Sequence, residues 1–249
     1  MPRFVFRHVL ALLFCSSIAS VAFAQTVDEV IEKHIAALGG RAALSKLTSR
    51  VSTGTISVTT PAGDVTGSFE SDLKAPNKTR IYMKLGLMAI GAPDDMIIQQ
   101  KFDGTAGYVL NSLQGDAAVE GNQLENMRNN IFPTFFLSYK DSGTKVELGP
   151  KEQVNGKPAQ VLLVTPKSGS AARIYLDPET YLIIKTVTKV NVPAAGGEIE
   201  QTTGLSDYRT VDGVKVAHQI MQSNPQQTFT IKIDKVQHNV ALDDAIFKK

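Results

Sequence analysis

The residues that could do acid–base or metal chemistry are few and scattered. Beyond the first 24 residues the histidines are His34, His218 and His238, which form no H-E-x-x-H motif or other pair at ligand spacing. A single cysteine excludes both a disulfide framework and a zinc site built on paired thiolates. His34 falls on the apolar stripe of a predicted helix, where we expect a core or boundary histidine. The sequence therefore predicts no metal centre and no cofactor.

Motifs for nucleophilic catalysis and phosphate binding also lack support. Ser71 and Lys74 match the S-x-x-K pattern of penicillin-recognising enzymes, but strand alternation puts the two side chains on different faces, and no K-T-G exists. No G-x-S-x-G, G-x-x-x-x-G-K or G-x-G-x-x-G motif occurs. We therefore expect a protein that is not an enzyme, and a hydrolase ranks last among the functions considered.

Two acidic pairs, Asp94-Asp95 and Asp243-Asp244, are the remaining candidates for binding a hard cation. A calcium loop needs several oxygen ligands at alternating positions, and neither pair has them. We expect these carboxylates to serve in turns and helix caps instead.

The first 24 residues have the pattern of a secretory signal peptide. Arg3 and Arg7 precede an apolar stretch, and small residues ending in Ala22-Phe23-Ala24 follow. The alternatives are a membrane anchor, for which the apolar part is short, and lipidation of Cys15, which follows the bulky Phe14. We expect this segment to direct export to the periplasm or the cell exterior and to be cleaved before Gln25.

Composition excludes several partner classes. The 249 residues carry 26 Lys and Arg against 24 Asp and Glu, and a net charge of +2 is too weak to indicate nucleic-acid binding. Removing residues 1–24 removes two arginines, no acid and the only cysteine, which leaves a neutral chain. Such an exported chain must be held together by core packing and sheet hydrogen bonds, without disulfides.

The remaining residues, 25–249, read as one domain that is mainly β with helices. Apolar spacing and the stop signal Gly39-Gly40 predict helices at 27–38 and 41–47, and 119–128 is also compatible with a helix. From residue 51 onward the period is two, most clearly at 65–74, where Asp72 falls on the polar face. We predict about eleven strands of an antiparallel sheet, each with one dry and one wet face.

The dry face is a large apolar surface with little predicted structure to cover it. It could close on itself as a solid core, or it could leave a cavity for an acyl chain. A chain of roughly 15 carbons would gain on the order of 12 kcal/mol in such a cavity, at about 0.8 kcal/mol per buried CH₂. The candidate lining is apolar: Phe69, Ile81, Met83, Leu85, Met96, Ile98, Phe229 and Ile231, with Ile131, Phe132, Phe135 and Phe136 near a lid.

Four stretches together resemble the periplasmic lipoprotein carrier superfamily, the LolA/LolB-like outer membrane lipoprotein-sorting proteins. They are residues 30–40 with Ala43-Leu44, residues 175–180, residues 206–215 and residues 242–247. The resemblance implies an unclosed antiparallel β-barrel with helices covering its open side and a hydrophobic cavity between them. It also implies that acyl chains enter this cavity and are passed to the outer membrane.

The first hypothesis is thus a non-enzymatic periplasmic carrier or sensor that binds the acyl chains of a lipid or lipoprotein. It implies a monomer, no nucleic acid, and a membrane-bound protein as donor or acceptor of the cargo. The alternative is an envelope interaction module that grips a protein with the same concave face and binds no lipid.

Overall fold

A computed structural model describes residues 25–60, 63–92, 94–192, 197–225 and 227–249. The predicted signal peptide and Cys15 lie outside the described residues. Within the described ranges no helix combines the length and the apolar character needed to cross a membrane.

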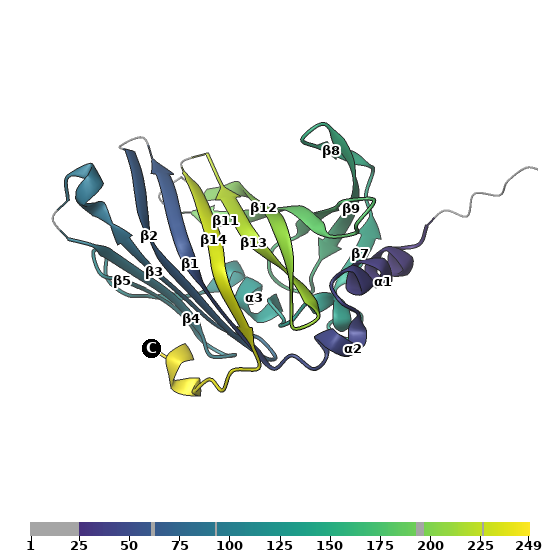
Figure 1. The fold of residues 1–249 in the computed structure, drawn as a ribbon, viewed down its shortest axis with the longest axis horizontal. Coiled ribbons are helices and arrows are strands. Elements are labelled where there is room, and N and C mark those ends of the chain that lie inside the picture. The colour runs from purple at the N-terminus through teal and green to yellow at the C-terminus, as the bar shows by residue number, and fades with distance from the viewer. Residues whose placement is uncertain (1–24, 61–62, 93, 193–196, 226) are drawn as a thin grey trace, which may run out of the picture.

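Most of the described chain is β-strand, with short helices at both ends and in the middle (Figure 1). The helices are α1 (Val27–Ala37), α2 (Arg41–Leu44) and α3 (Gly121–Asn129), with 3₁₀ turns η1 (Leu87–Ile90), η2 (Phe135–Leu137) and η4 (Asp244–Phe247). The strands are β1 (Ser49–Thr60), β2 (Gly63–Lys74), β3 (Lys78–Gly86), β4 (Met96–Phe102), β5 (Gly107–Asn111), β6 (Ala117–Val119), β7 (Lys145–Leu148), β8 (Glu152–Val154), β9 (Lys157–Thr165), β10 (Ala172–Leu176), β11 (Ile183–Val192), β12 (Gly197–Val211), β13 (Val214–Ser223) and β14 (Thr228–His238).

The strands form one antiparallel sheet that does not close. Its order is β6-β5-β4-β3-β2-β1-β14-β13-β12-β11-β10-β9-β7, with β8 paired to β9. The prediction of about eleven strands was wrong, because the described chain contains fourteen. Strands of three or four residues such as β6, β7 and β8 are too short to show a period-two pattern. The antiparallel, unclosed architecture itself agrees with the expectation.

The sheet is bent, and its two ends lie on opposite sides of the molecule (Figure 1). Strands β2 and β3 approach each other closely at Gly67. A Cβ atom at this position would lie 1.9 Å from the carbonyl oxygen of Lys84, so only glycine fits.

Register defines one inward face that runs across the whole sheet. Ile174 of β10 pairs with Thr186, Thr186 with Thr203, and Thr203 with Gln222. The same row continues through Phe229 of β14 to Val58 and Val65. Because directly paired residues of antiparallel strands share a face, all these side chains point to one side of the sheet.

Two apolar clusters occupy different parts of this inward face. The arm cluster, on β1–β3 and η1, consists of Ile56, Val58, Val65, Phe69, Leu85 and Leu87. The hairpin cluster joins α1 and α2 to β9, β10 and β13 and consists of Val30, Ile31, Ile35, Leu44, Leu47, Phe132, Phe136, Leu162, Val164, Ile174, Leu176, Val214 and Val216.

The N-terminal helical hairpin forms as predicted, although α2 ends at Leu44 rather than at residue 47. Helix α1 begins with a capping box between Thr26 and Glu29, which satisfies two backbone N–H groups at its start. The predicted helix at 119–128 divides: β6 ends at Val119, and α3 covers Gly121–Asn129.

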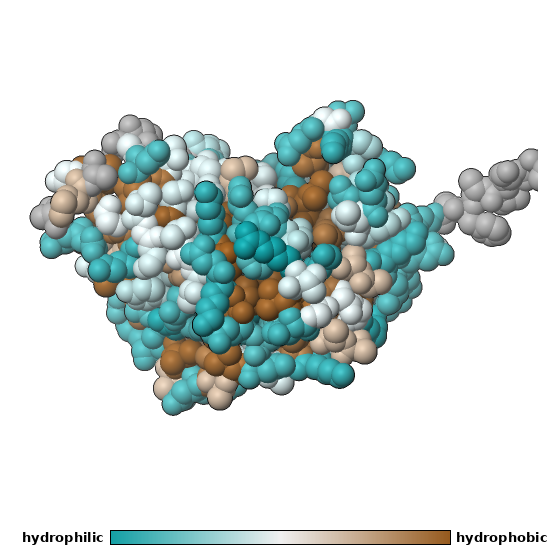
Figure 2. Space-filling model, in the orientation of Figure 1, coloured by the Kyte–Doolittle hydropathy of each residue, from teal (hydrophilic) through white to brown (hydrophobic). Residues whose placement is uncertain are grey.

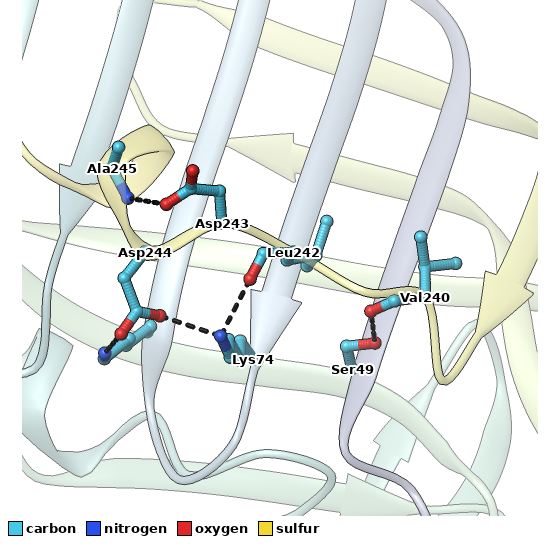
Figure 3. A network of polar contacts seen from close by, with 8 residues as sticks. Ser49, Lys74, Val240, Leu242, Asp243, Asp244 and Ala245 are labelled. Atoms are coloured by element: carbon cyan, nitrogen blue, oxygen red, sulfur yellow. Dashed lines mark hydrogen bonds and ion pairs between the residues drawn. The ribbon is translucent and has the colours of Figure 1, made fainter.

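The alternation predicted that the outer face is exposed to solvent, but part of this face is buried. Asp72 is buried and forms an ion pair with Arg80. Over the neighbouring strands lies the C-terminal segment, a strap in which Lys74 Nζ donates to the Leu242 carbonyl and to Asp244, both at 2.8 Å (Figure 3). Asp243 caps η4 by accepting from the Ala245 amide, which confirms the cap prediction for this residue, whereas Asp244 forms ion pairs with Lys74 and Lys78.

Candidate functional site

A cavity of about 780 Å³ lies against the inward face, between α3 and strands β9–β13. Its size is within the usual range for small-molecule sites. It is lined by Gln100, Gln123, Asn126, Met127, Arg128, Asn129, Asn130, Ile131, Phe135, Ser138, Ser142, Thr144, Val164, Pro166, Ser170, Ala172, Ile174, Thr186, Thr188, Val190, Gln201, Thr203 and Gln222. In the space-filling view the outline of the molecule is notched between the β1–β3 side and the β8–β9 side (Figure 2).

Helix α3 bridges the two ends of the sheet over this cavity. On one side Arg128 Nη2 donates to the Thr105 carbonyl, before β5, at 3.3 Å. On the other side Asn126 accepts from the Ser170 amide at 2.8 Å, and Asn129 Nδ2 donates to the Ser168 carbonyl at 2.7 Å. The helix is therefore held on the sheet by these polar contacts and by Leu124 and Met127, which pack on Gly107 of β5, and none of its residues is fully buried.

The loop between β9 and β10 is shaped to receive α3. Gly169 has a φ of +95°, and a Cβ atom there would lie 2.7 Å from Asn126 Oδ1. Glycine is therefore required both by the backbone conformation and by the close approach of the helix. Around it, Ser168 Oγ donates to Glu125 at 2.6 Å. We call the contacts of Glu125, Asn126 and Asn129 with this loop the α3 latch.

The strand wall of the cavity carries no charge, and its β11–β13 part is mainly polar. On β11–β13 the cavity is lined by Val190 and by five uncharged polar residues, Thr186, Thr188, Gln201, Thr203 and Gln222, which we call the polar band. Sequence reasoning missed them, because they were neither apolar nor part of a catalytic motif. The signal was present as alternation: Thr186 and Thr188 flank Val187, which faces the opposite side and is buried.

The twelve residues predicted to bind lipid are divided among the cavity, the two apolar clusters and one further inward position. Ile131 and Phe135 line the cavity, whereas Phe132 and Phe136 are buried in the hairpin cluster. Ile98 lies on the inward face opposite Met83. The other seven belong to the arm cluster or pack against it: Phe69, Ile81, Met83, Leu85, Met96, Phe229 and Ile231.

Arg50 is a half-buried cation that sequence reasoning did not single out. It faces inward on β1, opposite His238 of β14, and its Cζ lies 5.8 Å from the centre of the Phe132 ring. Burial lowers the pKa of its guanidinium to about 10. Its Nε is buried without a hydrogen-bond partner among the described residues. Arg50 is not among the residues that line the cavity.

The histidines form no catalytic arrangement within the described ranges. His34 Nδ1 contacts the Tyr181 carbonyl at 2.8 Å, His218 Nδ1 contacts the Val216 carbonyl at 2.9 Å, and His238 contacts Asp212 at 3.1 Å. His34 is 1% exposed, as expected of a core histidine, and burial lowers the pKa of its imidazole. No group of three or more His, Cys, Asp or Glu residues in the described part could hold a metal ion.

Solved structures share this fold over nearly the whole chain. A domain described as an outer membrane lipoprotein-sorting protein, from Vibrio parahaemolyticus, matches with a TM-score of 0.57 at 12% identity, covering 89% of this chain and 95% of that one. A LolA superfamily protein from Nitrosomonas europaea matches with a TM-score of 0.56 at 13% identity, covering 91% and 99%. A DUF1329 family protein from Desulfovibrio piger gives 0.58 at 14% identity, covering 90% and 98%.

These matches confirm the predicted resemblance to the lipoprotein carrier superfamily in fold. At 12–14% identity the likeness concerns the fold alone. No protein-family model matches the chain, and a search of curated protein sequences finds no match.

Proposed function

We propose that the protein is a non-enzymatic carrier or sensor of the periplasm that holds the acyl chain of a lipid or lipoprotein against the inward face of its sheet. The observation that carries the proposal is the cavity of about 780 Å³, which lies between the strand wall and α3 in a fold shared with lipoprotein-sorting proteins. Ile131, Phe135 and Ile174 provide apolar contacts at its wall.

In this proposal the helices cover the open side of the sheet, and α3 serves as the lid. Its few polar anchors support that role, because a lid must open at a modest cost in free energy. Of the twelve predicted apolar residues, the ligand first meets Ile131 and Phe135, because these two line the cavity. The arm cluster offers further apolar surface when the partly exposed residues that pack against it, such as Met83 and Phe229, move aside.

Export through the predicted signal peptide, a monomeric state and transfer of cargo to a membrane-bound protein complete the proposal. The N-terminal sequence pattern supports export, and the lipoprotein-sorting name of one structural neighbour supports the transfer of cargo.

The test is ligand content and uptake. Protein purified from the exporting host should release an acyl lipid detectable by mass spectrometry, and the delipidated protein should take up a fluorescent fatty acid at about one per chain. Phe135→Asp should weaken uptake at least tenfold, because it places an uncompensated charge at the cavity wall. The matched control is Leu113→Asp, since Leu113 is 54% exposed and does not line the cavity. Absence of both lipid and uptake would overturn the proposal.

The second candidate is an interaction module without a lipid ligand. It is favoured by the arm cluster, whose Phe69 and Leu85 are 6% and 2% exposed because they pack against each other and their neighbours. This function predicts capture of an envelope protein by the delipidated protein, and the capture should persist in Phe135→Asp.

A further inference from the structure

The polar band on β11–β13 is a continuous patch rather than a set of isolated residues. Thr186, Thr203 and Gln222 are direct register partners on three adjacent strands, and Thr188 pairs with Gln201 in the next row. Neighbouring strands are about 5 Å apart, so the patch is about 10 Å wide between β11 and β13. Gln100, from β4, adds another amide to the lining of the same cavity.

The side chains of this band have no partners of their own within the described ranges. All five are half-buried, yet no hydrogen bond reaches the hydroxyl of Thr203 or the amide of Gln222 from any described residue. In contrast, Asn126 and Asn129 across the cavity are engaged in the α3 latch. Polar groups that face a cavity without a protein partner are free to bind a ligand that satisfies them.

The cavity offers no free charge to an ionised ligand. Among its lining residues only Arg128 is charged, and its guanidinium already pairs with Glu125 and donates to the Thr105 carbonyl. An ionised headgroup would therefore lose its hydration without gaining a counter-ion. The band thus favours a polar ligand that is uncharged.

The band is also continuous with apolar surface on the same face. In the row of Thr203 and Gln222, the next inward residues are Phe229 on β14 and Val58 on β1. A ligand that lies along this row meets hydroxyls and amides at one end and apolar side chains at the other. Such a ligand is an amphiphile.

We infer that the polar band is the headgroup subsite of this cavity and that it takes the sugar of an uncharged glycolipid. Threonine hydroxyls and glutamine amides can both donate and accept, which matches the paired donor and acceptor character of sugar hydroxyls. A peptide suits the site less well, because the strands beneath it are interior to the sheet and their backbone groups are already paired on both sides. This inference rests on the proposed carrier function.

The test compares ligands that share one acyl chain. Dodecyl maltoside, dodecyl phosphate and dodecanoate are titrated into the delipidated full-length protein below their micelle concentrations, with free maltose as a chainless control. The maltoside should bind at least tenfold more tightly than the two anionic ligands. Thr203→Val and Gln222→Leu should each weaken maltoside binding about two- to tenfold and leave dodecanoate binding unchanged. The matched control is Thr202→Val, on the same strand but facing the other side.

Each possible failure has a separate meaning. Equal affinity for all three headgroups, unaffected by Thr203→Val, overturns the sugar subsite and leaves the carrier function standing. A preference for dodecyl phosphate that disappears in Arg50→Gln also overturns it, and assigns headgroup binding to Arg50. If none of the acyl ligands binds, the proposed function and this inference fail together.

Discussion

The two halves of the inward face use the same backbone pattern for different purposes. On β1–β3 the inward positions hold the arm cluster, whose side chains are 1–8% exposed and pack on one another. On β11–β13 the inward positions hold the polar band, half-buried and without hydrogen-bond partners among the described residues. The first half stabilises the sheet, whereas the second leaves a cavity. Stability and ligand contact are therefore separated along one continuous face.

The largest effect should come from the arm cluster. Phe69→Ala removes a side chain that is 6% exposed and should lower the free energy of unfolding by about 3–5 kcal/mol. Thr203→Val, on the cavity half, should change it by about 0.5 kcal/mol or less, because its side chain is half-buried and makes no hydrogen bond within the described ranges. Urea unfolding followed by circular dichroism measures both values.

Comparable losses in the two variants would contradict the division of the face. A large loss in Thr203→Val alone would mean that the cavity half, not the arm cluster, carries the stability of the sheet.

A smaller and local effect is expected at the α3 latch. Asn126→Ala removes two contacts with Ser170, one to its amide at 2.8 Å and one to its hydroxyl at 3.1 Å. The local opening free energy of α3 should fall by about 1–2 kcal/mol, at roughly 1 kcal/mol per hydrogen bond. Amide hydrogen exchange of residues 121–129 should become about tenfold faster, and ligand uptake should be faster as well.

The control is Asn122→Ala on the same helix, because Asn122 is exposed and has no side-chain hydrogen bond among the described residues. If exchange in α3 is unchanged in Asn126→Ala, then the latch does not hold the helix and the proposed lid loses its support.

Local periodicity explains which parts of this molecule could be predicted from its sequence. In β2, Val65 and Phe69 alternate with exposed residues over a long strand, so the antiparallel sheet and its dry face were predictable. On the outer face, Asp72 is buried beside Arg80, and Lys74 of the same strand binds the C-terminal strap some 170 residues away. No local sequence pattern indicates a contact between residues so far apart in the chain.

The cavity was harder to predict for a related reason. Thr203 and Gln222 become neighbours only through the pairing of β12 with β13, and a threonine or glutamine on a strand usually indicates a solvent-facing position. Here α3 is placed over them by contacts with Ser168 and Ser170, which depend on the tertiary fold.

The smallest predicted effect concerns pH and the strap over the outer face of the arm half. Hydrogen bonds from Lys74 and Lys78 lower the pKa of the Asp244 carboxyl to about 2, from an ordinary value of 3.8. A lowered folded-state pKa stabilises the fold above the unfolded pKa, and this contribution is lost as the pH falls from about 4 towards 2.

Wild type should therefore be more stable than Asp244→Asn at pH 5, by a margin that shrinks between pH 4 and pH 2. Because Asp244 and both lysines are partly exposed, solvent screens the contribution and the margin should be modest. Thermal melts at each pH measure it, with Asp141→Asn, at an exposed acid outside the strap, as the control. A margin that stays constant down to pH 2 would show that these ion pairs do not hold the strap, and that the arm half is stabilised from its inward face alone.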